Sequence, residues 1–192
     1  NPFFMGAFLL LCIVLSAMTF DRNKAWKNEA TLFSTDMPYL ENCARANYYY
    51  GNMKYRAYPS AANPTEQDKL KNEMLYRFNK SIEITDNSFY AFWHLTRAYM
   101  NFAMYDEAYQ TLQKAYKIYP DEFKTHHLMG MYYYYTQDYE TAIDWFEKGK
   151  KMAIKNQENY YYLAWSYYKN GEAETAIEIM LKAIEIQPEY EG

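Results

Sequence analysis

Small and large side chains recur with a period of 34 residues over the second half of the chain. A small residue takes the same place in three successive units at Ala108, Ala142 and Ala176. The same register holds at four further sets of positions: Tyr99, Tyr133 and Tyr167; Leu95-Thr96, Met129-Gly130 and Leu163-Ala164; Leu112, Phe146 and Met180; and Ala115, Gly149 and Ala183. A unit of this length, with small residues in both halves, predicts two antiparallel helices that cross closely and pack on the next pair.

This pattern resembles the tetratricopeptide repeat (TPR). The resemblance predicts an all-α fold, a TPR α-solenoid of about four repeats that occupies residues 44–190. Three repeats follow one another directly at residues 89–122, 123–156 and 157–190. A first repeat at residues 44–88 keeps the register but contains an inserted loop at residues 57–62, which is either a tolerated surface insertion or a contact loop near a membrane. After the loop, Asn63 and Glu66 are expected to cap the next helix, with Pro64 at its first position.

The N-terminal stretch is apolar enough to cross a membrane. Residues 3–20 carry no charge, and a helix needs roughly 17–25 such residues to span the hydrocarbon core. A secretory signal peptide is the alternative, but its apolar core is shorter, about 7–15 residues, and follows positive charge. No basic residue precedes this stretch, so we predict a transmembrane helix at residues 1–20, with the lipid membrane as a partner of residues 3–20.

Residues 21–43 are predicted to form a juxtamembrane linker and a short capping helix. Arg22, Lys24 and Lys27 suit lipid headgroups, and Trp26 suits the interfacial belt. These positive charges favour a cytoplasmic location for the residues that follow, but long domains translocate regardless of flanking charge.

Two short motifs follow the apolar segment. The first is Asp21-Arg22-Asn23-Lys24-x-Trp26-x-Asn28-Glu29-x-x-Leu32-Phe33, and the second is Asn42-x-Ala44-Arg45-Ala46 followed by Gly51-Asn52. Together they resemble the junction between the last membrane helix and the TPR array of the transmembrane-and-TPR-containing proteins and their bacterial relatives. Those proteins are membrane glycosyltransferases of the protein O-mannosyltransferase type. Leu40-Glu41 stand where that family usually has Asn-Pro.

The resemblance implies that this chain is the C-terminal part of a polytopic glycosyltransferase. Catalysis would then lie in membrane segments upstream, with a lipid-linked sugar donor, and no residue of this chain would be catalytic. The array would lie on the lumenal or periplasmic side and hold a glycan-acceptor protein or another partner. The alternative is a non-enzymatic, single-span TPR scaffold or adaptor for the assembly or secretion of a membrane complex.

Charge and reactive side chains argue against several function classes. The net charge of −4 and the lack of a strongly basic helix argue against a nucleic-acid partner. Cys12 and Cys43 lie in an apolar and a polar region, so no disulfide is expected between them. His126 and His127 are adjacent, so on a helix they point about 100° apart and do not share a metal. We expect His126 to pack between helices and His127 to face a binding groove, and we expect no catalytic residue, metal or cofactor.

The concave groove of a TPR array is lined by fixed positions of each first helix. These positions are rich in aromatic residues with interspersed cations, which suits a peptide segment or sugar rings. The alternative is that the 24 tyrosines serve as general packing material. The predicted groove residues are Arg45, Tyr48, Asn52, Tyr55, Tyr90, Trp93, Arg97, His127, Met131, Tyr134, Tyr161, Trp165 and Tyr168, with Lys124 and Glu158 at the second position of their repeats.

Overall fold

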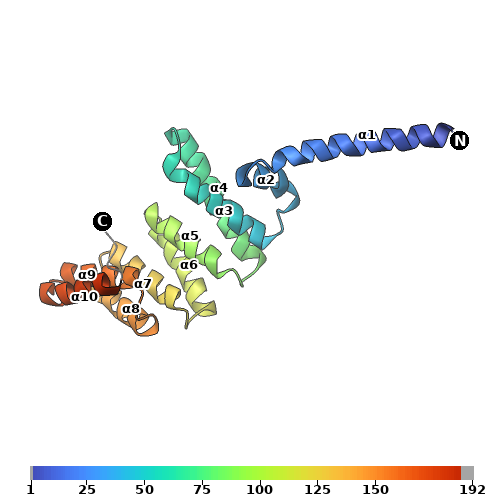
Figure 1. Ribbon diagram of the computed structural model, residues 1–192. Coiled ribbons are helices and arrows are strands. Elements are labelled where there is room, and N and C mark those ends of the chain that lie inside the picture. The colour runs from blue at the N-terminus through green and yellow to red at the C-terminus, as the bar shows by residue number, and fades with distance from the viewer. Residues whose placement is uncertain (1, 187–192) are drawn as a thin grey trace. The chain divides into compact units, whose positions relative to one another are not determined.

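The predicted all-α class is confirmed by the structure. A computed structural model describes residues 2–186 of the chain, apart from the side chains at positions 2, 3, 25 and 29, and within this range it contains helices and no β-strand (Figure 1). The end of the last predicted repeat, residues 187–190, lies outside the described residues. The elements are α1 (Pro2–Ala25), α2 (Glu29–Asp36), the 3-10 helix η1 (Met37–Tyr39), α3 (Ala44–Ala57), the 3-10 helix η2 (Tyr58–Ser60), α4 (Pro64–Ile84), α5 (Phe89–Asn101), α6 (Tyr105–Ile118), α7 (Phe123–Tyr135), α8 (Tyr139–Met152), α9 (Gln157–Lys169) and α10 (Ala173–Ile186).

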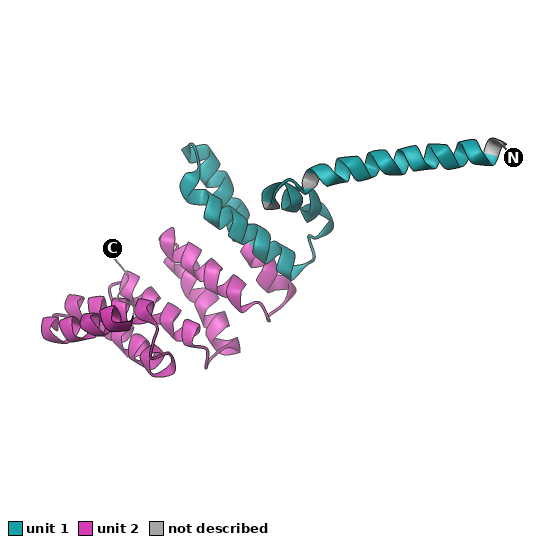
Figure 2. Cartoon of the chain, in the orientation of Figure 1, with its two compact units in different colours: residues 1–77 teal, residues 78–192 magenta. Residues whose placement is uncertain are grey.

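The chain forms two compact units (Figure 2). Unit 1 comprises Asn1–Arg77 and unit 2 comprises Phe78–Gly192. The division falls inside α4, and therefore inside the repeat predicted at residues 44–88.

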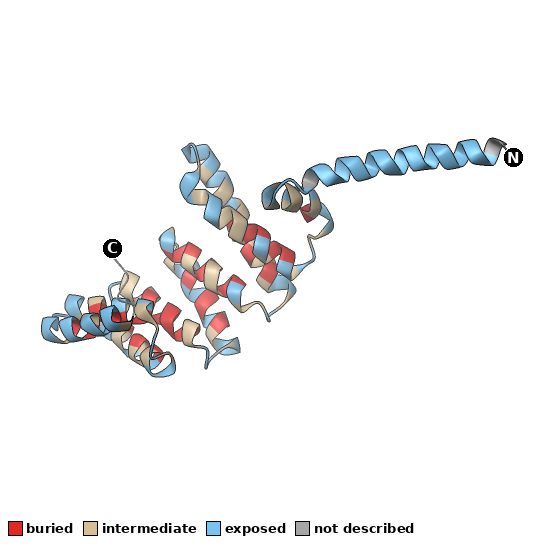
Figure 3. Ribbon diagram, viewed as in Figure 1, coloured by how far each residue is buried: buried red, intermediate tan, exposed pale blue. Residues whose placement is uncertain are grey.

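The first helix of unit 1 is exposed on all sides (Figure 3). The segment Phe4–Lys24 has a mean hydropathy of 2.0, and none of it is buried. At its C-terminal end α1 contacts α2, where the Arg22 guanidinium donates to the Asp36 carboxylate at 2.8 Å. The Asn28 side chain caps α2 by accepting from the Thr31 backbone N–H at 2.9 Å, as Asn commonly does at this position. The structure thus contains a long apolar helix followed by a short capped one.

A small core holds the rest of unit 1 together. Met37, Ala46 and Tyr50 are buried, and Phe33 and Leu40 pack against them. Next to this core, a charged network ties α4 to the segment before α3.

Arg77 is the centre of that network. Its guanidinium donates to Glu41 at 2.7 Å and to Glu73 at 2.8 Å, and it also donates to the Asn47 side-chain oxygen at 3.2 Å. Asn47 is itself buried and donates to the Glu41 backbone carbonyl at 2.8 Å. Glu41 therefore has a structural role in this chain.

The predicted cap of α4 is confirmed. The Glu66 backbone N–H donates to the Asn63 side chain at 2.9 Å, and the Glu66 carboxylate accepts from the Ala62 backbone N–H at 2.8 Å. Pro64 is the first residue of the helix, where its missing N–H costs nothing. The inserted loop before it contains η2.

The described part of unit 2 contains three helix hairpins, α5–α6, α7–α8 and α9–α10. Each first helix contacts the next first helix, and each second helix contacts the first helix that follows it. The 34-residue period is also present in the backbone, since Ala103, Gln137 and Gly171 all have positive φ angles, of 54°, 66° and 92°. Each of these residues lies in the turn inside a hairpin, so the three hairpins reverse direction in the same way.

Candidate functional site

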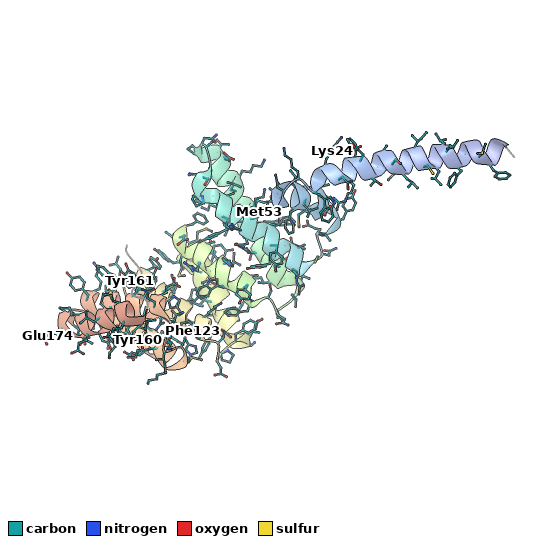
Figure 4. The ribbon with its side chains drawn as sticks, in the orientation of Figure 1. Lys24, Met53, Phe123, Tyr160, Tyr161 and Glu174 are labelled. Atoms are coloured by element: carbon teal, nitrogen blue, oxygen red, sulfur yellow. The ribbon has the colours of Figure 1, made fainter. Side chains whose placement is uncertain are left out.

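The predicted binding residues of unit 2 lie on the first helices α5, α7 and α9. Figure 4 labels two neighbours on α9 that differ in burial: Tyr161 is 46% exposed, whereas Tyr160 is 6% exposed and belongs to the core. We use the name first-helix face for the surface formed by Tyr90, Trp93, Arg97, Lys124, Tyr134, Glu158, Tyr161, Trp165 and Tyr168. Each of these side chains is at least partly exposed.

Trp93 lies at the centre of an aromatic and cationic cluster on this face. Its ring stacks on His127, with centroids 5.9 Å apart and an interplanar angle of 20°. The Arg97 guanidinium carbon lies 5.5 Å from the Trp93 ring centroid, and the Lys124 Nζ lies 5.7 Å from it. Lys124 Nζ also lies 4.6 Å from the Tyr90 ring. These cation–π contacts hold two positive charges above a hydrophobic platform.

His127 is not exposed, contrary to the prediction that it faces the groove. Its side chain is 1% exposed, because it is enclosed by the rings of Trp93, Phe123, Phe146 and Tyr162. The ring lies beneath the face and supports Trp93. Its Nε2 atom has no hydrogen-bond partner among the described residues.

Asn159 determines which nitrogen of His127 carries the proton. The Asn159 amide nitrogen donates to the Phe146 backbone carbonyl at 2.8 Å, so its Oδ1 is an acceptor. His127 Nδ1 lies 3.1 Å from that Oδ1 and must therefore be the donor.

Glu158 is the acid that faces these groups. Its two carboxylate oxygens lie 3.7 Å from Arg97 Nη2 and 3.7 Å from His127 Nε2. The proximity of His127, followed by that of Arg97, holds the pKa of Glu158 below its ordinary value, against the opposing effect of burial. Glu158 is therefore ionised at neutral pH.

Met131 is also buried, at 3% exposure. It lies in the interior of α7 and does not form part of the exposed face, which corrects its place among the predicted groove residues. Tyr134 is half-buried and packs edge-to-face on Tyr162 at 5.5 Å between ring centroids. Burial raises the pKa of Tyr134 and raises that of Tyr162, so both phenols stay neutral.

The aromatic residues of α9 border a cavity at the end of the described hairpins. Trp165 packs edge-on against Tyr161 at 6.2 Å and against Tyr168 at 5.7 Å. The Trp165 Nε1 atom is buried and has no hydrogen-bond partner within the described part of the chain. The cavity has a volume of about 250 Å³ and is lined by Ala164, Trp165, Tyr168, Ala173, Ala176, Ile177 and Met180.

The predicted groove residues of the first repeat lie in unit 1. Arg45, Tyr48, Asn52 and Tyr55 are all on α3, where Arg45 is exposed and the other three are half-buried. The predicted residues that are at least partly exposed therefore fall into two sets, one on α3 and one on the first-helix face of unit 2, whereas His127 and Met131 are buried.

Asn159 is a site residue that sequence reasoning missed. It occupies the third position of its repeat, where Ala91 and Thr125 stand in the two preceding repeats, and all three are fully buried. A large polar side chain at a buried position must find hydrogen-bond partners. That signal was present in the sequence, but the identity of the partner was not.

The adjacent histidines His126 and His127 have separate surroundings. His126 Nδ1 lies 3.2 Å from the Glu122 backbone oxygen, and its ring packs against Trp145 at 5.4 Å. Over residues 2–186, no group of three metal-ligating side chains comes together.

A family model described as tetratricopeptide repeat matches residues 90–122, and one described as anaphase-promoting complex, cyclosome, subunit 3 matches residues 135–190. No curated protein sequence matches the chain significantly.

Solved structures are similar in fold. A thermophilic TPR protein of Thermus thermophilus, TTC0263, is 18% identical, with a TM-score of 0.68 over 95% of this chain and 91% of that one. YrrB, described as a TPR protein with an unusual peptide-binding site, is 18% identical, with a TM-score of 0.62 over 92% of this chain and 83% of that one. MamA of Desulfovibrio magneticus RS-1 is 15% identical, with a TM-score of 0.62 over 83% of this chain and 84% of that one. At these identities the likeness is one of fold alone.

Proposed function

We propose that this chain binds an extended segment of a partner protein on the first-helix face. The chain is a tetratricopeptide repeat protein with the α-solenoid fold predicted from its sequence. The observation that carries the proposal is the partly exposed cluster of Trp93, Arg97 and Lys124, continued on α9 by Tyr161 and Trp165. Rigid aromatic side chains with polar tips give large contact areas at a low cost in conformational entropy. YrrB, whose fold is similar, is described as having a peptide-binding site.

A site-specific photo-crosslinking experiment tests this proposal. A photoreactive phenylalanine analogue replaces Tyr161 or Tyr90, both exposed on the face, and the matched control replaces Tyr109, which is exposed on α6. We expect a defined cross-linked partner from positions 161 and 90 in native membranes, and none from position 109. The same cross-link should weaken in a Trp165→Ala variant whose far-UV circular dichroism is unchanged. Equal labelling from all three positions contradicts the proposal.

We also propose that α1 spans a membrane and anchors the chain. It is 24 residues long, which corresponds to about 36 Å of helix, and its apolar side chains are exposed. Lys24 and Trp26 follow at the end that faces α2 and suit the lipid interface. A signal sequence is the competing assignment. Extraction of native membranes with alkaline carbonate decides between them: an anchored chain stays in the pellet, and a processed one lacks α1 by mass spectrometry.

The junction motifs support a more specific proposal, that the chain is the C-terminal array of a polytopic membrane glycosyltransferase that uses a lipid-linked sugar donor. In that case the array binds the acceptor protein, or a partner, on the lumenal or periplasmic side. A non-enzymatic TPR scaffold is the second candidate. An antibody raised against residues 86–192 separates them, because a polytopic enzyme gives a band far heavier than 23.1 kDa, whereas a single-span scaffold gives a band of about that mass. Protease protection of the same epitope in sealed vesicles reports the side of the membrane.

A further inference from the structure

The cavity between α9 and α10 repeats a groove that is filled one hairpin earlier. Counted back by one repeat, its lining residues correspond to Gly130, Met131, Tyr134, Tyr139, Ala142, Ile143 and Phe146 on α7 and α8. The ring of Tyr162, on the following helix α9, stacks on Phe146 with centroids 5.9 Å apart and lies edge-on to Tyr134 at 5.5 Å. In the earlier hairpin, this groove therefore holds an aromatic side chain of the next helix.

The equivalent groove of the last described hairpin is open to solvent. Phe146 is fully buried and Tyr134 is half-buried, whereas their counterparts are more exposed: Met180 is partly exposed and Tyr168 is 56% exposed. No helix is described after α10. The described residues thus form the walls of a helix-binding groove and leave it accessible.

An apolar stripe on α10 borders this cavity. It consists of Ile177, Leu181 and Ile184, which are 62%, 56% and 54% exposed and lie on one side of the helix because they are spaced four and three residues apart. On α8 the positions of Leu181 and Ile184 are held by Glu147 and Lys150, which form an ion pair at 2.6 Å. Outer helices of repeat arrays that face water are polar, so the apolar stripe indicates that another apolar surface covers it.

An acidic row runs along the other edge of the apolar stripe. It consists of Glu174, Glu178 and Glu185, which are all exposed. At about 100° per residue, each of them lies within about 60° of Leu181, on the side away from the cavity, whereas Lys182 lies about 100° from Leu181. In an antiparallel pair of α10 helices from two copies, the two acidic rows would meet, and like charges brought together oppose binding. The charge pattern therefore favours a basic partner over a second copy of this chain.

We propose that the groove between α9 and α10 binds an amphipathic helix of a partner protein, with a tyrosine or phenylalanine on its apolar side and basic residues beside it. The aromatic ring enters the cavity against Met180, as Tyr162 packs on Phe146. The apolar side of the helix covers the apolar stripe, and its basic residues pair with the acidic row. Trp165 and Tyr168 border both this groove and the first-helix face, but α10 contributes no residue to that face, so the two sites are distinct.

The test uses the full chain in detergent micelles and three fluorescent, hydrocarbon-stapled helices of 13 residues, the length of α9. The first carries a leucine stripe with one central tyrosine and a row of lysines beside it. The second has glutamates in place of the lysines, and the third has serine in place of the tyrosine. Binding is measured by fluorescence anisotropy, with empty micelles as the blank. We expect the first helix to bind about ten-fold or more tightly than the others, because the second is repelled by the acidic row and the third leaves the cavity unfilled.

Two pairs of variants locate the site. Ile177→Glu places a charge in the apolar stripe and should weaken binding of the first helix about ten-fold or more, whereas Ile154→Glu, at an exposed position before α9, should change nothing. Glu178→Gln should weaken binding about 2–5-fold, and Glu107→Gln, which removes the same charge from an exposed position on α6, should leave it unchanged. Ile177 and Glu178 are both exposed, so the far-UV circular dichroism of these variants should match that of the parent chain.

The other outcomes overturn this inference. Equal binding of the lysine and glutamate helices means that the acidic row selects nothing. Equal effects of Ile177→Glu and Ile154→Glu, or binding of none of the helices, mean that the groove is not the site. Sedimentation that changes from dimer to monomer in Ile177→Glu means that a second copy covers the apolar stripe. The proposed function is tested separately, by cross-linking from positions 161 and 90, and does not depend on these results.

Discussion

The ring of Phe146 on α8 lies directly against the backbone of Gly130 on α7. A Cβ atom added at Gly130 would come within 2.6 Å of that ring, far inside contact distance. We therefore predict that Gly130→Ala destabilises the chain by about 1–3 kcal/mol through overpacking, more than the roughly 0.5–1 kcal/mol that alanine contributes in a helix. Urea unfolding followed by circular dichroism measures this change.

The preceding repeat suggests a compensating change. Thr96 and Leu112 occupy the positions of Gly130 and Phe146 one repeat earlier, so a larger residue on the first helix is matched by a smaller one on the second. Gly130→Ala combined with Phe146→Leu should recover at least half of the lost stability. Additive losses in the double variant would show that the two residues do not constrain each other.

The turns inside the hairpins provide a second prediction. Ala103 and Gln137 have positive φ angles, at the place where the last repeat has Gly171. A residue with a side chain is strained by about 1–2 kcal/mol in the left-handed conformation, whereas glycine is not. Glycine instead loses about 0.5–1 kcal/mol more conformational entropy on folding. The difference predicts that Gln137→Gly stabilises the chain by about 0.5–1 kcal/mol. Gly171→Ala should destabilise it by a similar amount. Urea midpoints that move in the same direction in both variants would contradict this account.

His94 makes stability depend on pH. Burial, followed by the charges of Arg97 and Lys124, lowers the pKa of His94 to about 4. In the unfolded chain His94 has its ordinary pKa of 6.5, so below that pH the unfolded state binds a proton that the folded state does not bind. The stabilisation is therefore complete above pH 6.5 and is lost as the pH falls toward 4. Between about pH 7 and about pH 5 we expect a loss of about 1–2 kcal/mol, which allows for partial exposure of the ring.

The variant that isolates this effect is His94→Gln. It should remove the pH dependence between about pH 7 and about pH 5, because Gln does not titrate there. The lowered pKa of Glu158 contributes to a loss of stability at lower pH, below 4.5. An unchanged slope in His94→Gln, measured by urea unfolding at both pH values, would place the effect on another group.

Arg77 provides a prediction in unit 1. Its side chain is 13% exposed, and its guanidinium is bonded to two carboxylates that are themselves partly exposed. Arg77→Met should destabilise the chain by about 1–2 kcal/mol, because the bonds to charged partners are lost while Glu41 and Glu73 regain some hydration. Lys69→Met, at an exposed position of the same helix, is the control and should change stability by less than about 0.5 kcal/mol. Equal effects of the two substitutions would show that the network adds nothing.

The sequence alone determined the helices and their repetition. Small residues at 34-residue intervals predicted the hairpins, and the cap formed by Asn63 and Glu66 was predicted correctly because capping depends on neighbours in the chain. The repeat positions also placed Trp93 and Arg97 on the same face of α5, since residues four apart in a helix lie on one side.

Only the tertiary structure decided how deep each residue lies. His127 was expected at the surface, but Trp93 on α5, Phe146 on α8 and Tyr162 on α9 enclose it. The helical period specifies the direction in which a side chain points. Whether that side chain is exposed to water depends on the size of the side chains that pack on it from other helices. The meeting of Arg97, His127 and Glu158 has the same origin, because three successive hairpins must pack before these residues come close.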